Sequence, residues 1–218
     1  IGEVWEDASN KIAYGVRRRY FQGGQLDGTM NYPLRDAIVD YVLGGGADAI
    51  AAFMETFTGN TPKPALNCMM NVLSTHDTAR ILTVLGANAL PETRAEAADF
   101  KLTDEEYDIG KKRLKLAAAL QYTLPGFPCV YYGDEAGAQG TADPFNRMPF
   151  PWGREDHEMI DWYKHLGKLR VKYSDIFSSG DYQLIKAEGG EFTFSRDGKI
   201  TISVNTDMIT AVITVEAL

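Results

Sequence analysis

The sequence has 218 residues, of which 44% are hydrophobic and 24% are charged, and its formal net charge is −8. This length allows one large globular domain or one domain with a small companion. The negative charge argues against nucleic acid as a partner, because that affinity comes mainly from neutralised phosphates. No stretch of the sequence is long and apolar enough to span a membrane, so no membrane partner is expected.

Two cysteines, Cys68 and Cys129, each lie inside an apolar run. Their number excludes a disulfide scaffold and predicts two buried free thiols. Unpaired thiols favour a cytoplasmic location. The first residue is Ile1, so the natural start of the protein is not in view and a signal segment cannot be sought there.

The N-terminal part of the sequence alternates short apolar strands with amphipathic helices. Pro33 suits the first turn of a helix, and Thr103 with Glu106 has the spacing of a capping box. The predicted strands are 1–5, 29–32, 67–74 and 128–133. The predicted helices are 34–42, 48–57, one ending at Gly86, 103–123 and 159–173, and a Gly- and Pro-rich loop spans 134–156.

From Gly180 onwards the pattern changes to short strands over 181–187, 191–196, 199–205 and 209–215. Asp197-Gly198 between two of them is a strong hairpin signal. We therefore expect an α/β part over 1–175 and an all-β part over 176–218.

Four strands separated by helices predict parallel βα units, in either a doubly wound sheet or a barrel. Catalytic groups collect at the carboxyl ends of the strands in (β/α)8 barrels. The distribution of polar residues favours a barrel, because each predicted strand ends in such residues: Glu3, Asn31, His76 with Asp77, and Asp134 with Glu135.

Glu3 ends a predicted buried strand beside Trp5. Burial there would favour the protonated carboxyl and fit Glu3 to donate a proton near neutral pH. The alternatives are a solvated strand end and an ion pair with a residue such as Arg17.

His76 and Asp77 end another buried strand and open a helix, which places them at the same rim as Glu3. Two structural alternatives stay open. Asp77 or Thr78 could cap the helix, and His76 could be a buried, hydrogen-bonded histidine.

Asp143 and Arg147 lie in the long loop after the last barrel-type strand. Sugar hydroxyls both donate and accept hydrogen bonds, so proteins bind sugars through paired Asp and Arg side chains and through aromatic faces. Trp5 and Tyr32 are the better candidates for such faces, since each lies near the rim. A loop-stabilising ion pair is the alternative for Asp143 and Arg147. The histidines show no paired metal-ligand spacing, so no metal site is predicted.

Three motifs occur in order: GEVWED, NVLSTHDTARILT and LPGFPCVYYGDEAGAQGTADPFNRMPFPW. Together they resemble the later half of the catalytic barrel of the alpha-amylase family of glycoside hydrolases. The MNYP stretch at 30–33 is similar to the neopullulanase, cyclomaltodextrinase and maltogenic amylase group. The resemblance implies the second half of a (β/α)8 TIM barrel, with strands five to eight, followed by a small all-β domain similar to the family's C-terminal β-sandwich.

The resemblance also implies catalytic roles. Glu3 would be the general acid/base. Asp77 would grip the distorted sugar and support the oxocarbenium-like transition state, and His76 would bind the sugar at the cleavage subsite.

Further residues would bind the substrate on either side of the cleaved bond. Asp143 and Arg147 would hold the next sugar on the non-reducing side, and Trp5 and Tyr32 would line the acceptor side. The partner implied is an α-glucan oligosaccharide.

The family's nucleophile lies in a GxRxDxA segment, which this sequence lacks. Retention of configuration needs such a carboxylate about 5 Å from the acid. We therefore expect a C-terminal fragment of an enzyme that hydrolyses α-1,4 bonds, with α-1,6 bonds left open, in maltodextrins, cyclodextrins or pullulan. The fragment alone should be inactive and should associate through the exposed edges of its half-barrel.

Two alternatives to this function stay open. One is a transglycosylating, sucrose-acting or trehalose-acting relative, and the other is a non-catalytic amylase-like binding protein. No cofactor is expected with certainty, and calcium is an open expectation for the full-length parent.

Overall fold

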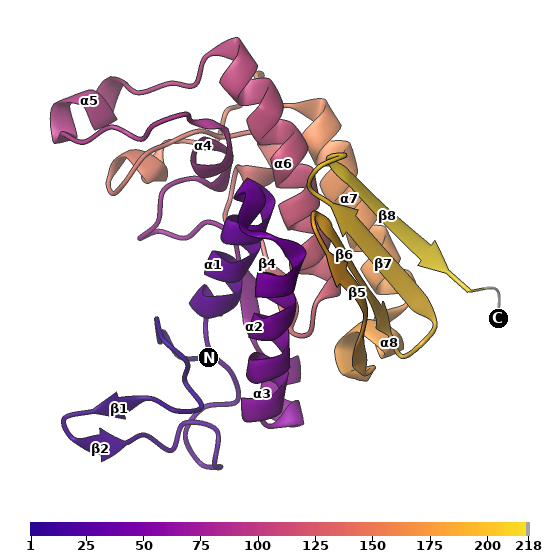
Figure 1. The fold of residues 1–218 in the computed structure, drawn as a ribbon. Helices are drawn as coiled ribbons and strands as arrows, with labels where there is room; N and C mark the ends of the chain where they lie inside the picture. Colours follow the sequence, from indigo (N-terminus) through magenta and orange to yellow (C-terminus); the bar gives the residue numbers. More distant parts are fainter. Residues whose placement is uncertain (217–218) are drawn as a thin grey trace.

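The computed structural model describes residues 1–216 (Figure 1). Its helices are α1 (Tyr32–Asp40), α2 (Ala47–Asn60), α3 (Lys63–Asn67), α4 (Ile81–Gly86), α5 (Arg94–Asp99), α6 (Asp104–Thr123), α7 (His157–Lys172) and α8 (Ser174–Ser179). Its strands are β1 (Ile12–Ala13), β2 (Val16–Arg17), β3 (Met70–Val72), β4 (Phe127–Cys129), β5 (Tyr182–Glu188), β6 (Glu191–Arg196), β7 (Ile200–Asn205) and β8 (Thr210–Val215). No helix in this range is long and apolar enough to cross a membrane.

Local signals in the sequence set where the main helices begin. The side chain of Asn31 caps α1 by accepting a hydrogen bond from the backbone N–H of Leu34, 3.4 Å away, with Pro33 in the first turn. At α6 the predicted capping box is present, because Thr103 and Glu106 each accept a hydrogen bond from the other's backbone N–H. Both predicted helix starts are confirmed.

The parallel strands are shorter than predicted. β3 and β4 pair in parallel over three residues each. The predicted strands 1–5 and 29–32 are only isolated parallel bridges, from Gly2 to Thr29 and from Met30 to β3. The chain leaves the ladder early because helix α1 begins at Tyr32 and a turn begins at Tyr131, whose carbonyl accepts a hydrogen bond from the N–H of Asp134.

Helix α3 occupies the start of the predicted strand 67–74. The four parallel segments nevertheless lie side by side in chain order, as consecutive barrel strands do.

The C-terminal part is an antiparallel sheet with the order β5-β6-β7-β8. One face of this sheet is part of the main hydrophobic core, with fully buried Phe192, Phe194, Ile202 and Val204. The hydroxyl of Tyr41 lies 2.8 Å from the carbonyl of Gly190, in the turn between β5 and β6, and 2.8 Å from that of Val204 in β7, and its one hydrogen is shared between them. Figure 1 shows the sheet beside α6. The domain boundary near residue 175 stays a prediction.

The two thiols are free, as predicted, but only half-buried. Burial raises the pKa of the Cys129 thiol, which favours its protonated form. Cys129 is half-buried because it lies at the end of β4, where the described sheet is short.

Candidate active site

The predicted site residues meet where the parallel segments end. The backbone N–H of Met30 donates to the carbonyl of Gly2 at 2.9 Å, and the N–H of Asn31 donates to the carbonyl of Met70 at 2.9 Å. Parallel segments that pair in this register end at the same edge of the sheet. The residues that follow them therefore converge on one rim, although they are far apart in the sequence.

Glu3, His76 and Asp77 form the centre of this rim. One carboxylate oxygen of each acid and one imidazole nitrogen all lie within 4.8 Å of one another. The Nε2 atom of His76 is 3.3 Å from a carboxylate oxygen of Asp77. The cluster brings two carboxylates and an imidazole to one point in solvent, which is a set of groups able to transfer protons and to stabilise a developing positive charge.

The expected burial of Glu3 is wrong, because its side chain is exposed and Trp5 does not cover it. The alternative partner, Arg17, bonds instead to the carbonyl of Ser9 and to the side chain of Asn10. The carboxylate of Glu3 therefore faces the open rim.

Trp5 and Tyr32 stack face to face, with ring centroids 3.8 Å apart and an interplanar angle of 9°. Tyr32 is 1% exposed and Trp5 is 48% exposed. The expectation of two open aromatic faces is therefore corrected to one, because Trp5 covers the ring of Tyr32. The hydroxyl of Tyr32 lies 3.4 Å from Glu3 and 3.3 Å from Thr75. Burial is the main cause that raises the pKa of Tyr32, so the hydroxyl stays protonated and can donate to Glu3.

Asp143 and Arg147 complete the rim from the long loop. Their side chains form an ion pair of 2.7 Å. The Nε atom of Arg147 also donates to the carbonyl of His76 at 3.1 Å, and its Nη2 lies 3.5 Å from Asp77. The pair therefore joins the loop to the carboxylate cluster.

Neither helix-capping alternative for Asp77 or Thr78 applies at α4, since the N–H of Ile81 donates to the hydroxyl of Ser74.

Asn146, which lies between the two members of that ion pair in the motif PFNR, is a site residue that the sequence pattern does not predict. Asn146 is fully buried, and its amide nitrogen donates to the carbonyls of Thr75, His76 and Thr78, at 3.2, 2.8 and 2.8 Å. One side chain therefore fixes the backbone turn that presents His76 and Asp77. The feature of the sequence that could have pointed to Asn146 is its position next to Arg147.

The sequence pattern also does not predict a role for Arg80, and it indicates Asp134 only as a rim residue. Both are buried and pair at 3.2 Å. Arg80 also donates to the carbonyls of Asn146 and Tyr132. Burial raises the pKa of Asp134 to about 6, against the opposing effects of Ser74 and Arg80. This pair fastens the loop after β4 to the segment that carries the catalytic candidates.

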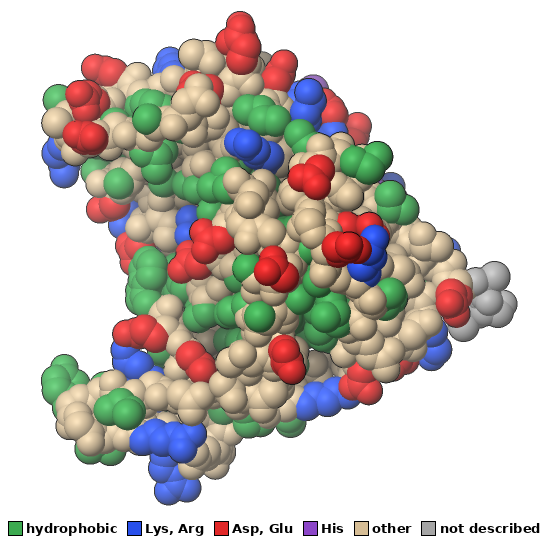
Figure 2. Space-filling view, in the orientation of Figure 1, with side chains coloured by type: hydrophobic (Ala, Val, Ile, Leu, Met, Phe, Trp, Pro, Cys, Tyr) green, Lys and Arg blue, Asp and Glu red, His purple; other side chains and the backbone are tan. Residues whose placement is uncertain are grey.

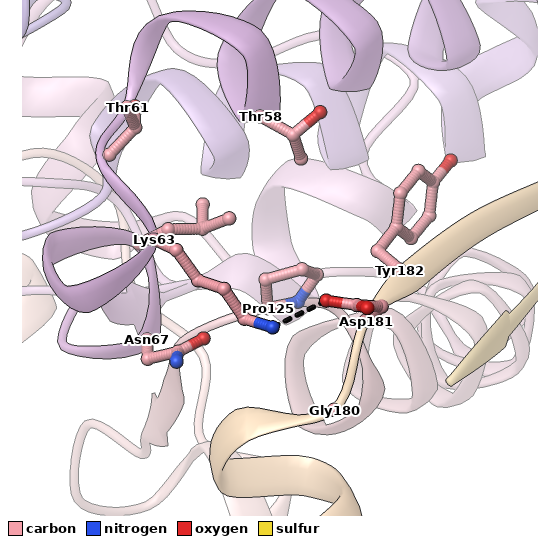
Figure 3. A pocket seen from close by; sticks show the side chains of 9 residues that line it. Thr58, Thr61, Lys63, Asn67, Pro125, Gly180, Asp181 and Tyr182 are labelled. Atoms are coloured by element: carbon pink, nitrogen blue, oxygen red, sulfur yellow. Dashed lines mark hydrogen bonds and ion pairs between the residues drawn. The ribbon is translucent and has the colours of Figure 1, made fainter. Parts of the chain in front are cut away.

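A small pocket elsewhere holds none of the predicted site residues (Figure 3). Lys63 and Asp181 approach each other across it at 2.5 Å. Asn67 and Pro125 line it and precede β3 and β4, so the pocket lies toward the amino ends of these strands. Residues at that end of a barrel serve stability rather than catalysis, and an exposed ion pair adds little.

A parallel barrel rim that carries two carboxylates, an imidazole and an Asp–Arg pair is the type of site found in barrel glycosidases. The family model described as "Alpha amylase, catalytic domain" matches residues 1–176. The chain therefore belongs to the alpha-amylase family of glycoside hydrolases.

The names of two similar proteins agree with this family assignment. An amylopullulanase of Thermoanaerobacter thermohydrosulfuricus is 34% identical over 90% of this chain, and a cyclomaltodextrinase of a Bacillus species is 30% identical over 86%. The chain spans 13% and 29% of the lengths of these two proteins.

Solved structures show the same fold. The type III pullulan hydrolase from Thermococcus kodakarensis has a TM-score of 0.76 at 26% identity and covers 94% of this chain and 33% of its own. A cyclic alpha-maltosyl-(1→6)-maltose hydrolase from Arthrobacter globiformis has a TM-score of 0.74 at 25% identity and covers 93% of this chain and 40% of its own. The predicted family and fold class are thereby confirmed.

Proposed function

We propose that this chain supplies part of the active site of a retaining α-glycosidase that cleaves α-1,4 glucosidic bonds in maltodextrins, cyclodextrins or pullulan, with cleavage of α-1,6 bonds left open. The observation that carries the proposal is the cluster of Glu3, His76 and Asp77 at the barrel rim. The substrate class follows from the names of the relatives, which include an amylopullulanase and a cyclomaltodextrinase.

In this proposal Glu3 protonates the glycosidic oxygen as the bond breaks, and it later takes a proton from the attacking water. The Tyr32 hydroxyl, 3.4 Å away, helps to orient its carboxylate. Asp77 stabilises the positive charge that develops on the sugar ring, and His76 beside it binds a sugar hydroxyl.

Residues 1–218 contain no GxRxDxA segment. Within the described residues, the cluster offers the carboxylates of Glu3 and Asp77 only. A retaining enzyme also needs a nucleophilic carboxylate, about 5 Å from the acid. We therefore propose that the 218 residues alone bind α-glucan but do not hydrolyse it.

The test measures maltoheptaose binding by calorimetry, together with the release of reducing ends from pullulan, β-cyclodextrin and maltodextrin. We expect binding without turnover. Trp5→Ala should weaken binding about fivefold, because it removes the exposed ring at the rim. Asn60→Ala, at an exposed position on α2, should leave binding unchanged. Measurable turnover would contradict the proposal that these residues lack the nucleophile. A lack of any binding would contradict the proposal that the rim is a glucan-binding site.

We further propose that the chain associates with itself through the barrel edge at β4. Within residues 1–216, β4 pairs only with β3. A hollow of about 430 Å³, with Tyr122, Val130 and Ile160 among its lining residues, adjoins this strand. An unpaired strand edge beside apolar side chains favours pairing with a second chain.

A further inference from the structure

A groove of about 610 Å³ lies between the segment of α5 and the loop that follows β4. In Figure 1 this segment and the orange loop project on the same side of the molecule. The volume is within the range of ligand sites. The groove is distinct from the rim, because none of the predicted site residues lines it.

Aromatic rings make up much of the groove wall. Phe145 and Phe150 come from the loop after β4, and Phe100 and Tyr107 come from the segment around α5 and from α6. All four rings are only partly buried. Phe145 and Phe150 lie outside the main hydrophobic core cluster and its packed neighbours. Partly exposed rings that do not serve the core provide apolar faces for a ligand.

The free polar groups of the groove are hydrogen-bond donors. Lys101 and Arg154 line it, and neither makes an ion pair within residues 1–216. The Oε1 atom of Gln139 accepts a hydrogen bond from the N–H of Leu102 at 2.9 Å, which leaves its amide N–H groups to donate. Donors beside apolar faces match a neutral sugar, whose hydroxyl oxygens accept hydrogen bonds and whose ring has an apolar side.

The groove also adjoins the catalytic loop. One short 3-10 turn carries Phe145, which lines the groove, and Arg147, which contacts His76 and Asp77. A sugar chain in the groove would therefore lie against the outer side of the loop that forms the rim.

We infer that this groove is a second α-glucan-binding site, separate from the rim and occupied by a malto-oligosaccharide segment. The choice of ligand class rests on the proposed function. The aromatic faces bind the sugar rings, and Lys101, Arg154 and Gln139 bind the hydroxyls.

The test measures maltoheptaose affinity by calorimetry in an Asp77→Asn, Trp5→Ala background, which weakens the rim site. Binding should persist there and should weaken about tenfold on adding Phe150→Ala. The double change Lys101→Gln, Arg154→Gln should weaken it as well. Both of its positions are exposed, so this variant keeps the test valid if Phe150→Ala fails to fold. Lys168→Gln, at an exposed position on α7, is the matched control and should have no effect.

Unchanged affinity in both groove variants would overturn the inference, and so would complete loss of binding in the background protein. Binding of inorganic phosphate in place of maltoheptaose would overturn it too, because the groove would then be an anion site. None of these results decides the proposed function. That function is tested separately, by the effect of Trp5→Ala on maltoheptaose binding in the otherwise wild-type protein.

Discussion

Asn146 shows how a residue that need not touch substrate can set the geometry of the site. Its amide nitrogen serves three carbonyls of the turn that presents His76 and Asp77. Backbone carbonyls buried without a donor are costly, so Asn146 stabilises the turn together with Thr78 and Arg147, which also bond its backbone. The neighbouring Arg147 then contacts a backbone that is already fixed.

Replacing Asn146 by Ala should destabilise the protein by about 2 kcal/mol, because the Thr78 carbonyl loses its donor, while the carbonyls of Thr75 and His76 keep only the Thr78 N–H and the Arg147 Nε. Urea unfolding followed by circular dichroism measures this loss. Asn60→Ala removes an exposed amide with no side-chain hydrogen bond in the described structure, and should change the stability by less than about 0.5 kcal/mol. Equal effects of the two substitutions would contradict the role of Asn146.

The buried carboxyl of Asp134 predicts a pH dependence of stability. Its folded-state pKa is raised from 3.8 to about 6, chiefly by burial. Between these values the folded protein binds a proton more strongly than the unfolded chain does. The free energy of unfolding should therefore fall as pH rises from about 4 to about 6, by up to about 3 kcal/mol.

Urea unfolding of the wild type and of Asp134→Asn across this pH range checks the prediction. Asn cannot titrate, so the variant should lack this component of the slope. The same slope in both proteins would mean that another group is responsible.

At the scale of elements, the hairpin of β1 and β2 is a projection from the connection that follows Trp5 (Figure 1). Its turn residues Tyr14 and Gly15 both have positive φ values, as a two-residue hairpin turn requires. Tyr14 is 97% exposed. Figure 2 shows the outline of the molecule indented between this hairpin at the lower left and the projection around α5 at the upper left. The hairpin thus forms one side of this indentation.

Replacing residues 10–17 by a Gly-Ser-Gly linker should shift ligand preference toward bulky cyclic glucans, because it removes the projection that bounds the indented side of the molecule. We expect the affinity for β-cyclodextrin relative to maltoheptaose to rise roughly threefold. Calorimetric titration of both ligands measures the ratio. Tyr14→Ser is the milder variant and should give a smaller shift in the same direction. An unchanged ratio would show that the hairpin does not shape this site.

At the scale of the whole molecule, the exposed edge at β4 predicts concentration-dependent association. Light scattering after size exclusion should show dimers or larger species that dissociate on dilution. Val130→Lys, in the hollow beside β4, should shift the population toward monomer, because the new charge opposes burial of that edge. Lys168→Gln on α7 serves as the control. A monomer at all concentrations would contradict the proposed association.

The sequence by itself determined the family, the helix starts and the C-terminal hairpins. Each of these depends on residues close together in the chain, such as the Thr103 and Glu106 capping box and the turn at Asp197 and Gly198. The motif residues at strand ends also predicted one common rim, because parallel strands end at the same edge.

Only the tertiary structure decided which side chains are buried and which residues from distant segments meet. The exposure of Glu3 depends on which segments pack around it. The stacking of Trp5 on Tyr32 and the three hydrogen bonds of Asn146 each join segments that are far apart in the sequence. Local pattern carries no information on such contacts, since they depend on how the segments pack. For the same reason the groove beside Phe145, which combines residues from α5, α6 and two loops, became visible only in the folded chain.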